Sequence, residues 1–208
     1  FSASEAENQH GVATHSSGNH AAALALAARI RQVKSHIVMP ENSPEIKKKA
    51  VRGYGAEITF CKPTQQAREE TLAQVVAKTG ARFIPPYNDH RIITGQGTAA
   101  LELLTEISDL DIVLVPVGGG GLASGTGIVV KSLSPDTELL GTEPEMADDA
   151  YRSFYSQEER IFPSVNPSTV ADGLKTALGD KTYPIIRRHF DGIVTVSESS
   201  IIDAMRRI

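Results

Sequence analysis

The spacing of hydrophobic positions changes repeatedly along the chain, from helical patterns to short continuous runs and back. Helices are predicted over residues 21–30, 44–51, 67–78 and 91–107, and from the glycines after Val117 to about residue 133. Short runs rich in β-branched residues separate them, at residues 36–39, 57–61, 82–84, 111–117 and 138–142. Strands that alternate with helices are typical of βαβ units, so we predict an α/β fold with parallel sheets flanked by helices. The run at 111–117 is continuous, which predicts a strand buried on both faces.

The turn Pro85-Pro86 is the best candidate for a domain boundary. It would divide a small βα lobe at residues 11–85 from part of a larger lobe at residues 86–208, with residues 1–10 a remnant or linker. Ser43 is the expected N-cap of the second helix, and Pro44 is its expected first residue. Because the chain opens with Phe1 and stops at Ile208 inside a helical pattern, we expect a piece of a longer protein, incomplete at both ends.

Composition narrows the class of protein. The 208 residues are 40% hydrophobic and 22% charged, which excludes a disordered chain or a coiled coil. A net charge of −4 argues against a nucleic-acid-binding protein, and no apolar run approaches the roughly 20 residues that span a bilayer. The single cysteine, Cys61, cannot form an internal disulfide and is expected to be a small buried hydrophobe, so a reducing, cytoplasmic compartment is predicted.

Four consecutive glycines, 118–121, lie between a predicted strand and a helix. Backbone N–H groups without side chains can approach an anion closely, and the helix N-terminus adds a partial positive charge, so this turn suits a phosphate. It is not a Walker A loop, because no Gly-Lys-Ser/Thr follows. A dinucleotide site is an alternative, with Gly119 and Gly121 opening the helix and Glu143 ending the next strand. The simplest alternative is a tight turn between strand and helix that binds no ligand.

The segment Thr14–His20 also joins an apolar run to a helix. Its hydroxyls, amide and imidazole lie beside unpaired helix N–H groups and suit a carboxylate or phenolate oxygen. A serine hydrolase would need a Gly-x-Ser-x-Gly elbow, which is absent, and zinc would need ligands beyond His15 and His20. Ordinary N-capping of the following helix is the alternative explanation of this segment.

Two charged segments have simpler explanations. Residues 143–149 place carboxylates and a backbone carbonyl within one turn, which suits Mg²⁺ or Ca²⁺, although acidic residues at a helix start also complement the macrodipole. The lysines at 47–49 are expected to form a solvated helix face.

Together these motifs resemble the serine racemases, which belong to the serine/threonine dehydratase group of fold-type II pyridoxal-phosphate (PLP) enzymes. The resemblance rests on Ser-Ser-Gly-Asn-His at 16–20, Gly-Gln-Gly-Thr at 95–98, the glycines after Val-Pro-Val, Glu-Pro-x-x-Ala-Asp-Asp at 143–149 and Ala-Asp-Gly at 171–173. It runs from about Gly11 to the C-terminus. It implies a two-lobed fold like the β subunit of tryptophan synthase, with PLP between the lobes.

The resemblance implies a role for each matching residue. The backbone of Gly118, Gly119, Gly120, Gly121 and Leu122 would hold the PLP phosphate, and Asn19 the phenolate oxygen. Substrate would be held by Ser16, Gly18, Asn19 and His20, with Arg68 a further candidate. Glu143, the Ala147 carbonyl and Asp149 would hold Mg²⁺, Ca²⁺ or Mn²⁺. A homodimer is implied, and activation by ATP is left open.

Ser17 would be the acid/base on one face of the substrate α-carbon. Racemisation needs a second proton donor opposite the family's lysine, whereas threonine dehydratases of the group tend to carry alanine here. The resemblance therefore implies a serine racemase that also dehydrates L-serine to pyruvate and ammonia. Threonine dehydratase and threo-3-hydroxyaspartate dehydratase are alternatives, of which Ser17 disfavours only the first.

Two departures from the family pattern stand out. Tyr87 lies where the animal racemase has an asparagine near the cofactor. The lysine that binds the cofactor lies upstream of the Ser16–His20 turn in the family, whereas all nine lysines here lie downstream, the first being Lys34. We therefore expect this chain alone to be inactive. A catalytically dead remnant is a further alternative.

Overall fold

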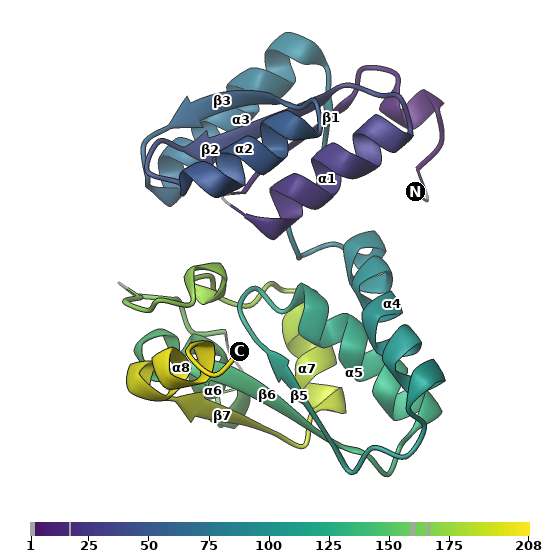
Figure 1. Cartoon of the computed structure of the whole chain (residues 1–208), viewed down its shortest axis with the longest axis vertical. Coiled ribbons are helices and arrows are strands. Elements are labelled where there is room, and N and C mark those ends of the chain that lie inside the picture. The colour runs from purple at the N-terminus through teal and green to yellow at the C-terminus, as the bar shows by residue number, and fades with distance from the viewer. Residues whose placement is uncertain (1–2, 17, 159–160, 166) are drawn as a thin grey trace. The chain divides into compact units, whose positions relative to one another are not determined.

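The computed structural model describes residues 3–16, 18–158, 161–165 and 167–208. The chain divides into two compact units, Phe1–Pro86 and Tyr87–Ile208 (Figure 1). Ser17 lies outside the described residues.

The first unit is a four-stranded parallel sheet with strand order β3-β2-β1-β4 (Figure 1). The chain runs outwards from β1 through β2 to β3 and then returns across the sheet to β4. In open α/β sheets, ligands bind outside the carboxyl ends of the strands where the order reverses. The elements are η1 (Ala6–Asn8), β1 (Val12–His15), α1 (Asn19–Ile30), β2 (Ser35–Pro40), α2 (Glu45–Gly53), β3 (Glu57–Cys61), α3 (Gln65–Thr79) and β4 (Arg82–Phe83).

Helices cover both faces of this sheet. Alternate residues of β2 point to opposite faces, so Ile37 and Met39 pack with Ala21 of α1 and Val51 of α2. Between them, Val38 packs on the other face, in a cluster of small and branched side chains that α3 completes. That cluster comprises Ala13, Val38, Cys61, Leu72 and Ala81.

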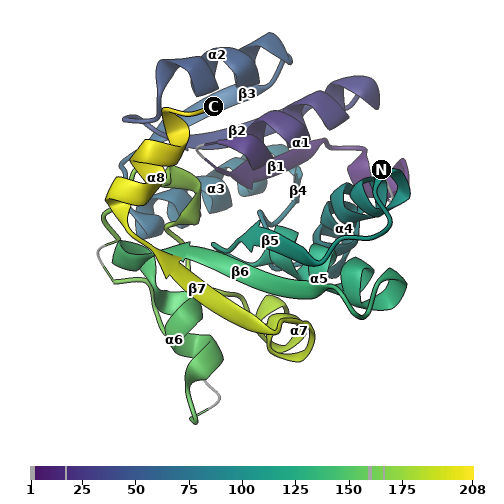
Figure 2. The ribbon, with the colours of Figure 1, turned by 60° about the horizontal axis from the view of Figure 1, so that its bottom comes forward.

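The second unit is a three-stranded parallel sheet, β5-β6-β7, with helices packed around one core (Figure 2). Branched side chains of β5, β6 and β7 meet α4, α5 and α7 in that core, among them Val115, Leu139, Val130 and Ile186. The elements are α4 (His90–Glu106), β5 (Ile112–Pro116), α5 (Gly121–Leu133), β6 (Glu138–Pro144), η2 (Glu145–Ala147), α6 (Asp149–Tyr155), η3 (Asp172–Leu174), α7 (Thr182–His189), β7 (Gly192–Val196) and α8 (Glu198–Met205).

Gly97 of α4 and Gly125 of α5 allow these two helices to approach closely. A β-carbon on Gly125 of α5 would lie 2.5 Å from both the Gly97 nitrogen and the Ile93 carbonyl oxygen of α4. A β-carbon on Gly95, earlier in α4, would meet no atom within 4 Å. Gly125 is therefore required by packing, whereas Gly95 is not.

We expect Gly125→Ala to destabilise the fold by roughly 1–3 kcal/mol, because the added methyl group forces the two helices apart. Gly95→Ala, the matched control, should be neutral or stabilise by about 0.5–1 kcal/mol, since alanine has the higher helix propensity. Urea denaturation of the two variants measures both effects. Equal stabilities would show that the α4–α5 contact does not need its glycines.

The predicted fold class is confirmed, and three details differ. In β5, Val113 and Val115 are buried while Ile112 and Leu114 are 51% and 61% exposed, so the prediction of burial on both faces is wrong for this chain. The second helix begins at Glu45 with Pro44 as N-cap, and the Ser43 hydroxyl has no partner among the described residues, so Ser43 does not cap it. The sequence analysis also missed β1, α6, α7 and β7.

Candidate cofactor and substrate site

The turn that follows β1 is held by backbone and hydroxyl contacts within the first unit. Ser16 donates its backbone N–H to the Val38 carbonyl at 3.1 Å, and the Gly18 N–H donates to the Ser16 hydroxyl oxygen at 3.3 Å. Asn19, the first residue of α1, is exposed. The structure thus places Ser16, Gly18, Asn19 and His20 in one turn at the carboxyl end of β1, beside the free N–H groups of a 12-residue helix.

Two imidazoles of this turn are electrically neutral near pH 7. Burial lowers the pKa of His20, whose Nε2 lies 3.4 Å from the Ile84 carbonyl oxygen. Burial also lowers the pKa of His15, and the positive charge of Arg68 lowers it further. The Thr14 hydroxyl donates to the same Ile84 carbonyl at 2.8 Å, which ties the turn to the segment after β4. His20 therefore serves as a neutral hydrogen-bonding group.

Cationic side chains reach this edge of the sheet from two helices. Arg68, in the first turn of α3, is half-buried, and its Nε has no hydrogen-bond partner among the described residues. Lys47, in the first turn of α2, lies over the turn: a β-carbon on Gly18 would be 3.4 Å from its Nζ. Lys48 is 9% exposed and donates to the Glu41 carbonyl and the Glu45 carboxylate, each at 2.8 Å. The predicted solvated lysine face is therefore wrong for Lys48.

The second unit holds the glycine turn between β5 and α5. Gly120 has φ of +86°, a left-handed conformation that favours glycine, and α5 begins at Gly121. A β-carbon on Gly120 would lie 2.9 Å from Leu178 and Thr182, and one on Gly118 would lie 3.0 Å from the Gly173 carbonyl oxygen. The turn therefore keeps a bare backbone at the N-terminus of a 13-residue helix.

Tyr87 packs directly against this turn. A β-carbon on Gly119 would lie 2.4 Å from the Tyr87 ring, and one on Gly121 would lie 2.9 Å from the Tyr87 β-carbon. The sequence analysis explained these glycines by anion binding or by a tight turn. Packing of Tyr87 also requires glycine at positions 119 and 121. Tyr87 thus contacts the glycine turn itself.

Thr182 forms hydrogen bonds that hold the glycine turn in place. The sequence analysis did not predict a role for this residue. Its buried hydroxyl donates to the Gly119 carbonyl at 2.8 Å and accepts from the Gly179 N–H at 2.9 Å. The Ser124 hydroxyl of α5 donates to the Thr182 carbonyl at 3.3 Å. No local pattern in the sequence marks Thr182, because its partners are distant in the chain.

Two buried carboxylates lie where β6 meets α6. Glu143 accepts the N–H groups of Ala150 and Tyr151 at 3.0 and 2.8 Å, and burial raises its pKa to about 8. Burial raises the pKa of Asp149 to about 6, and interaction with the Ser164 hydroxyl offsets part of that rise. Ala147, whose carbonyl is the third candidate ligand, lies between these two residues in sequence and is buried. This oxygen set fits a hard divalent cation, which would offset the cost of burying the two charges.

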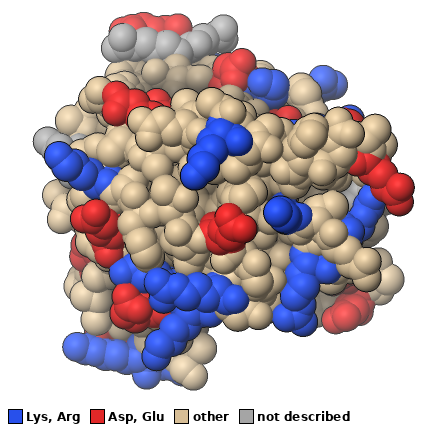
Figure 3. Space-filling model, turned by 90° about the horizontal axis from the view of Figure 1, so that it is seen from above, with Lys and Arg blue, Asp and Glu red and all other residues tan. Residues whose placement is uncertain are grey.

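Other candidate sites are not supported. The described part of the chain contains no cluster of three or more His, Cys, Asp or Glu side chains placed to hold a metal, which leaves the zinc alternative at His15 and His20 without ligands. Among the described residues, no helix is long and apolar enough to cross a membrane. On the face drawn in Figure 3, acidic side chains lie among the basic ones. Cys61 is buried, as predicted.

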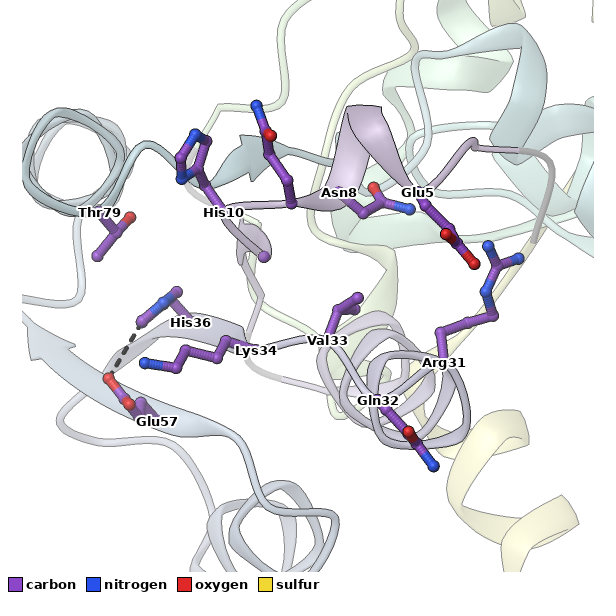
Figure 4. Close-up of a pocket in the computed structure, with 12 residues that line it drawn as sticks. Glu5, Asn8, His10, Arg31, Gln32, Val33, Lys34, His36, Glu57 and Thr79 are labelled. Carbon is purple, nitrogen blue, oxygen red and sulfur yellow. Dashed lines mark ion pairs between the residues drawn. The ribbon is translucent and has the colours of Figure 1, made fainter.

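The first unit also contains a cavity of about 820 Å³, shown in Figure 4. It is lined from the amino ends of β1, β2 and β3 and contains the ion pair between His36 Nδ1 and Glu57 Oε2, at 3.2 Å. The Ser16–His20 turn lies at the carboxyl ends of the same strands. The cavity and the candidate site are therefore at opposite edges of the sheet.

Comparison with known proteins decides the family. The family model described as "Pyridoxal-phosphate dependent enzyme" matches residues 1–208. The chain belongs to this family. It is 48% identical to a beta-hydroxyaspartate dehydratase of Paracoccus denitrificans, of which it covers 65%, and 45% identical to a serine racemase of Dictyostelium discoideum, of which it covers 64%. All 208 residues align in both cases.

Solved structures agree with this assignment. The chain superimposes on maize serine racemase with a TM-score of 0.95 and 40% identity, over 99% of this chain and 62% of that one. The processed form of threonine deaminase isoform 2 from Solanum lycopersicum gives a TM-score of 0.91 at 33% identity, over 99% and 60% of the two chains. The chain thus spans somewhat less than two thirds of these relatives. Membership in the PLP family favours PLP over a dinucleotide as the molecule whose phosphate the glycine turn would hold.

Proposed function

We propose that the complete protein is a PLP-dependent serine racemase that also dehydrates L-serine to pyruvate and ammonia. The observation that carries the proposal is the Ser16–His20 turn, with Ser17 in its sequence, in a chain 45% identical to a serine racemase. The bare glycine turn at the N-terminus of α5 supports the cofactor assignment, because its geometry fits a phosphate.

In this proposal PLP supplies the electron sink that makes the substrate α-proton acidic. The backbone N–H groups of residues 118–122 hold its phosphate, and Asn19 donates to its phenolate oxygen. Thr182 keeps the Gly119 carbonyl turned inwards, so that the N–H groups stay available. Tyr87 packs on the same turn and excludes water from it.

The substrate carboxylate is held by the turn that follows β1 in the first unit. Ser16, Gly18 and the first N–H groups of α1 bind it, with neutral His20 beside them and Arg68 supplying positive charge. Ser17 moves a proton to or from one face of the α-carbon. The acid/base on the other face is the family's lysine, which this chain does not contain, so we infer that the chain is inactive by itself.

Assay of the complete protein tests this function. With PLP and L-serine we expect both D-serine and pyruvate, each dependent on the cofactor. A protein that binds PLP but forms neither product would favour the alternative of a catalytically dead remnant. Formation of pyruvate without D-serine would favour a dehydratase.

We further propose that Glu143, the Ala147 carbonyl and Asp149 hold a divalent cation, for which Mg²⁺, Ca²⁺ and Mn²⁺ are candidates. Two carboxylates at 2% and 1% exposure, close together in the chain, support this assignment. The role is structural, because the cation would fix the start of α6 beside the end of β6.

Removal of the cation should lower the melting temperature. A cation present at about 100 times its dissociation constant stabilises a fold by about 2.7 kcal/mol, so EDTA should lower Tm by roughly 5–10 °C. Differential scanning calorimetry with and without EDTA measures this. Asp149→Asn should abolish the response to EDTA, and a variant that keeps the full response would contradict the ligand assignment.

A second candidate function is dehydration of threo-3-hydroxyaspartate. The 48% identity to a beta-hydroxyaspartate dehydratase favours it. Threonine dehydratase is disfavoured by Ser17. Homodimer formation, a cytoplasmic location and ATP activation stay predictions from the sequence.

A further inference from the structure

We infer that Glu198 is a positioning residue of the proposed cofactor site, whose carboxylate fixes the Thr169–Leu174 segment against the glycine turn. This inference rests on the proposed function, because it concerns how the same turn keeps the shape that a phosphate requires. It extends that proposal to the junction of β7 and α8, a part of the second unit that is distant in the chain.

The topology of the second unit places Glu198 at the same edge of the sheet as the glycine turn. The strands β5, β6 and β7 are parallel, so the segments that follow β5 and β7 both lie at the carboxyl edge. Glu198 is the first residue of α8, after the N-cap Ser197, whose hydroxyl accepts the Ser200 N–H at 3.2 Å. This cap fixes the start of the helix and with it the position of the half-buried Glu198.

The Glu198 carboxylate holds three successive residues of the loop before α7. Its Oε2 accepts the Val170 N–H at 2.9 Å. Interaction with the buried Thr169 hydroxyl, and then with the Val170 N–H, lowers the pKa of Glu198, so the group is charged near pH 7. The Thr169 oxygen also accepts the Ala171 N–H at 3.1 Å, which leaves its hydrogen available for a carboxylate. Residues 169–171 are therefore held as one unit.

These residues lead directly into the segment that packs on the glycine turn. The Ala171 carbonyl accepts the Leu174 N–H at 2.9 Å, which closes the short helix η3. A β-carbon on Gly118 would lie 3.0 Å from the Gly173 carbonyl oxygen and 3.2 Å from the Leu174 α-carbon. Both are backbone atoms, which cannot move aside by a change of rotamer. A displacement of η3 would therefore displace the glycine turn.

The loop depends on such contacts for its position. Between α6 and α7, η3 is the only helix or strand among the described residues. A segment without a regular ladder of backbone hydrogen bonds is positioned by its contacts with neighbouring elements. Just upstream, the Ser168 N–H donates to the neutral Met146 carbonyl at 3.3 Å. The bond to the Glu198 carboxylate is shorter and charge-assisted, so it is the stronger of the two.

The main test measures binding of PLP and of pyridoxal, which lacks the phosphate, to the complete protein freed of cofactor. Glu198→Ala should raise the dissociation constant for PLP roughly 10-fold and that for pyridoxal by less than about 3-fold. A general loss of stability would weaken both ligands equally, so the ratio isolates the phosphate site. Asp203→Ala is the matched control, because this carboxylate of α8 pairs with Arg206 of the same helix, and it should match the wild type.

Two further variants separate the carboxylate contact from an effect on α8. Thr169→Val leaves α8 unchanged and should raise the dissociation constant for PLP about 3- to 10-fold. Added to Glu198→Ala, it should weaken binding by less than a further factor of about 2, because both changes remove the same contact. Glu198→Gln keeps an acceptor for the Val170 N–H and should recover most of the affinity.

Unchanged PLP binding in Glu198→Ala, or equal weakening of PLP and pyridoxal, would overturn the inference. Fully additive effects of Glu198→Ala and Thr169→Val would overturn it as well. The proposed function fails in a different way. A wild-type protein that binds PLP more tightly than pyridoxal through Glu198, yet forms neither D-serine nor pyruvate, would refute the proposed activity and leave the positioning role intact.

Discussion

The Ser17→Ala variant of the complete protein is expected to lose racemisation of serine by roughly 10²- to 10⁴-fold while it still dehydrates L-serine. Racemisation needs a proton donor on each face of the α-carbon, and Ser17 is the proposed donor on one face. Dehydration of L-serine needs only removal of the α-proton from the other face and departure of the β-hydroxyl.

Two products of one reaction mixture check this expectation. D-serine should fall to background, whereas pyruvate should stay within about tenfold of the wild type, a change of about 1.4 kcal/mol in the barrier. In D₂O, recovered L-serine should still exchange its α-proton, because the lysine face is intact. Equal loss of both activities would remove Ser17 from the assigned role.

The Gly120→Val variant should destabilise the fold and abolish cofactor binding together. The left-handed φ of +86° at residue 120 is unfavourable for a β-branched residue, and a β-carbon there would lie 2.9 Å from Leu178 and Thr182. Strain and overpacking should cost about 2–5 kcal/mol. The displaced turn would no longer present its N–H groups to a phosphate.

Gly173→Ala is the matched control, because a β-carbon there meets no atom within 4 Å. Urea denaturation and PLP titration of both variants separate the two effects. Gly120→Ala adds a measure of backbone strain with less overpacking. Unchanged PLP affinity in Gly120→Val would show that this turn does not hold the phosphate.

Local patterns were sufficient to predict most of the fold. The period of apolar residues and the glycine turn predicted the alternation of strands and helices, which is confirmed. The start of α2 was predicted one residue early, because Pro44 fits both the N-cap and the first helical position. Burial of β5 on both faces was wrong because a continuous apolar run does not reveal which of its faces has a partner.

The site was predictable where motifs are local and not where they depend on distant residues. Ser16, Gly18, Asn19 and His20 are adjacent in sequence, so one turn contains them all. Thr182 and Tyr87 reach the glycine turn from about 60 and 30 residues away, and only the tertiary fold reveals those contacts. Lys47 was taken for a solvated residue because helical spacing alone does not show that α2 packs beside α1.

We propose as the central claim that Gly118–Leu122 of the second unit hold the phosphate of PLP. A crystal structure of the complete protein grown with PLP tests it most directly. The account predicts backbone N–H groups of the glycine turn at hydrogen-bond distance from the phosphate. A cofactor whose phosphate lies out of contact with this turn would contradict it.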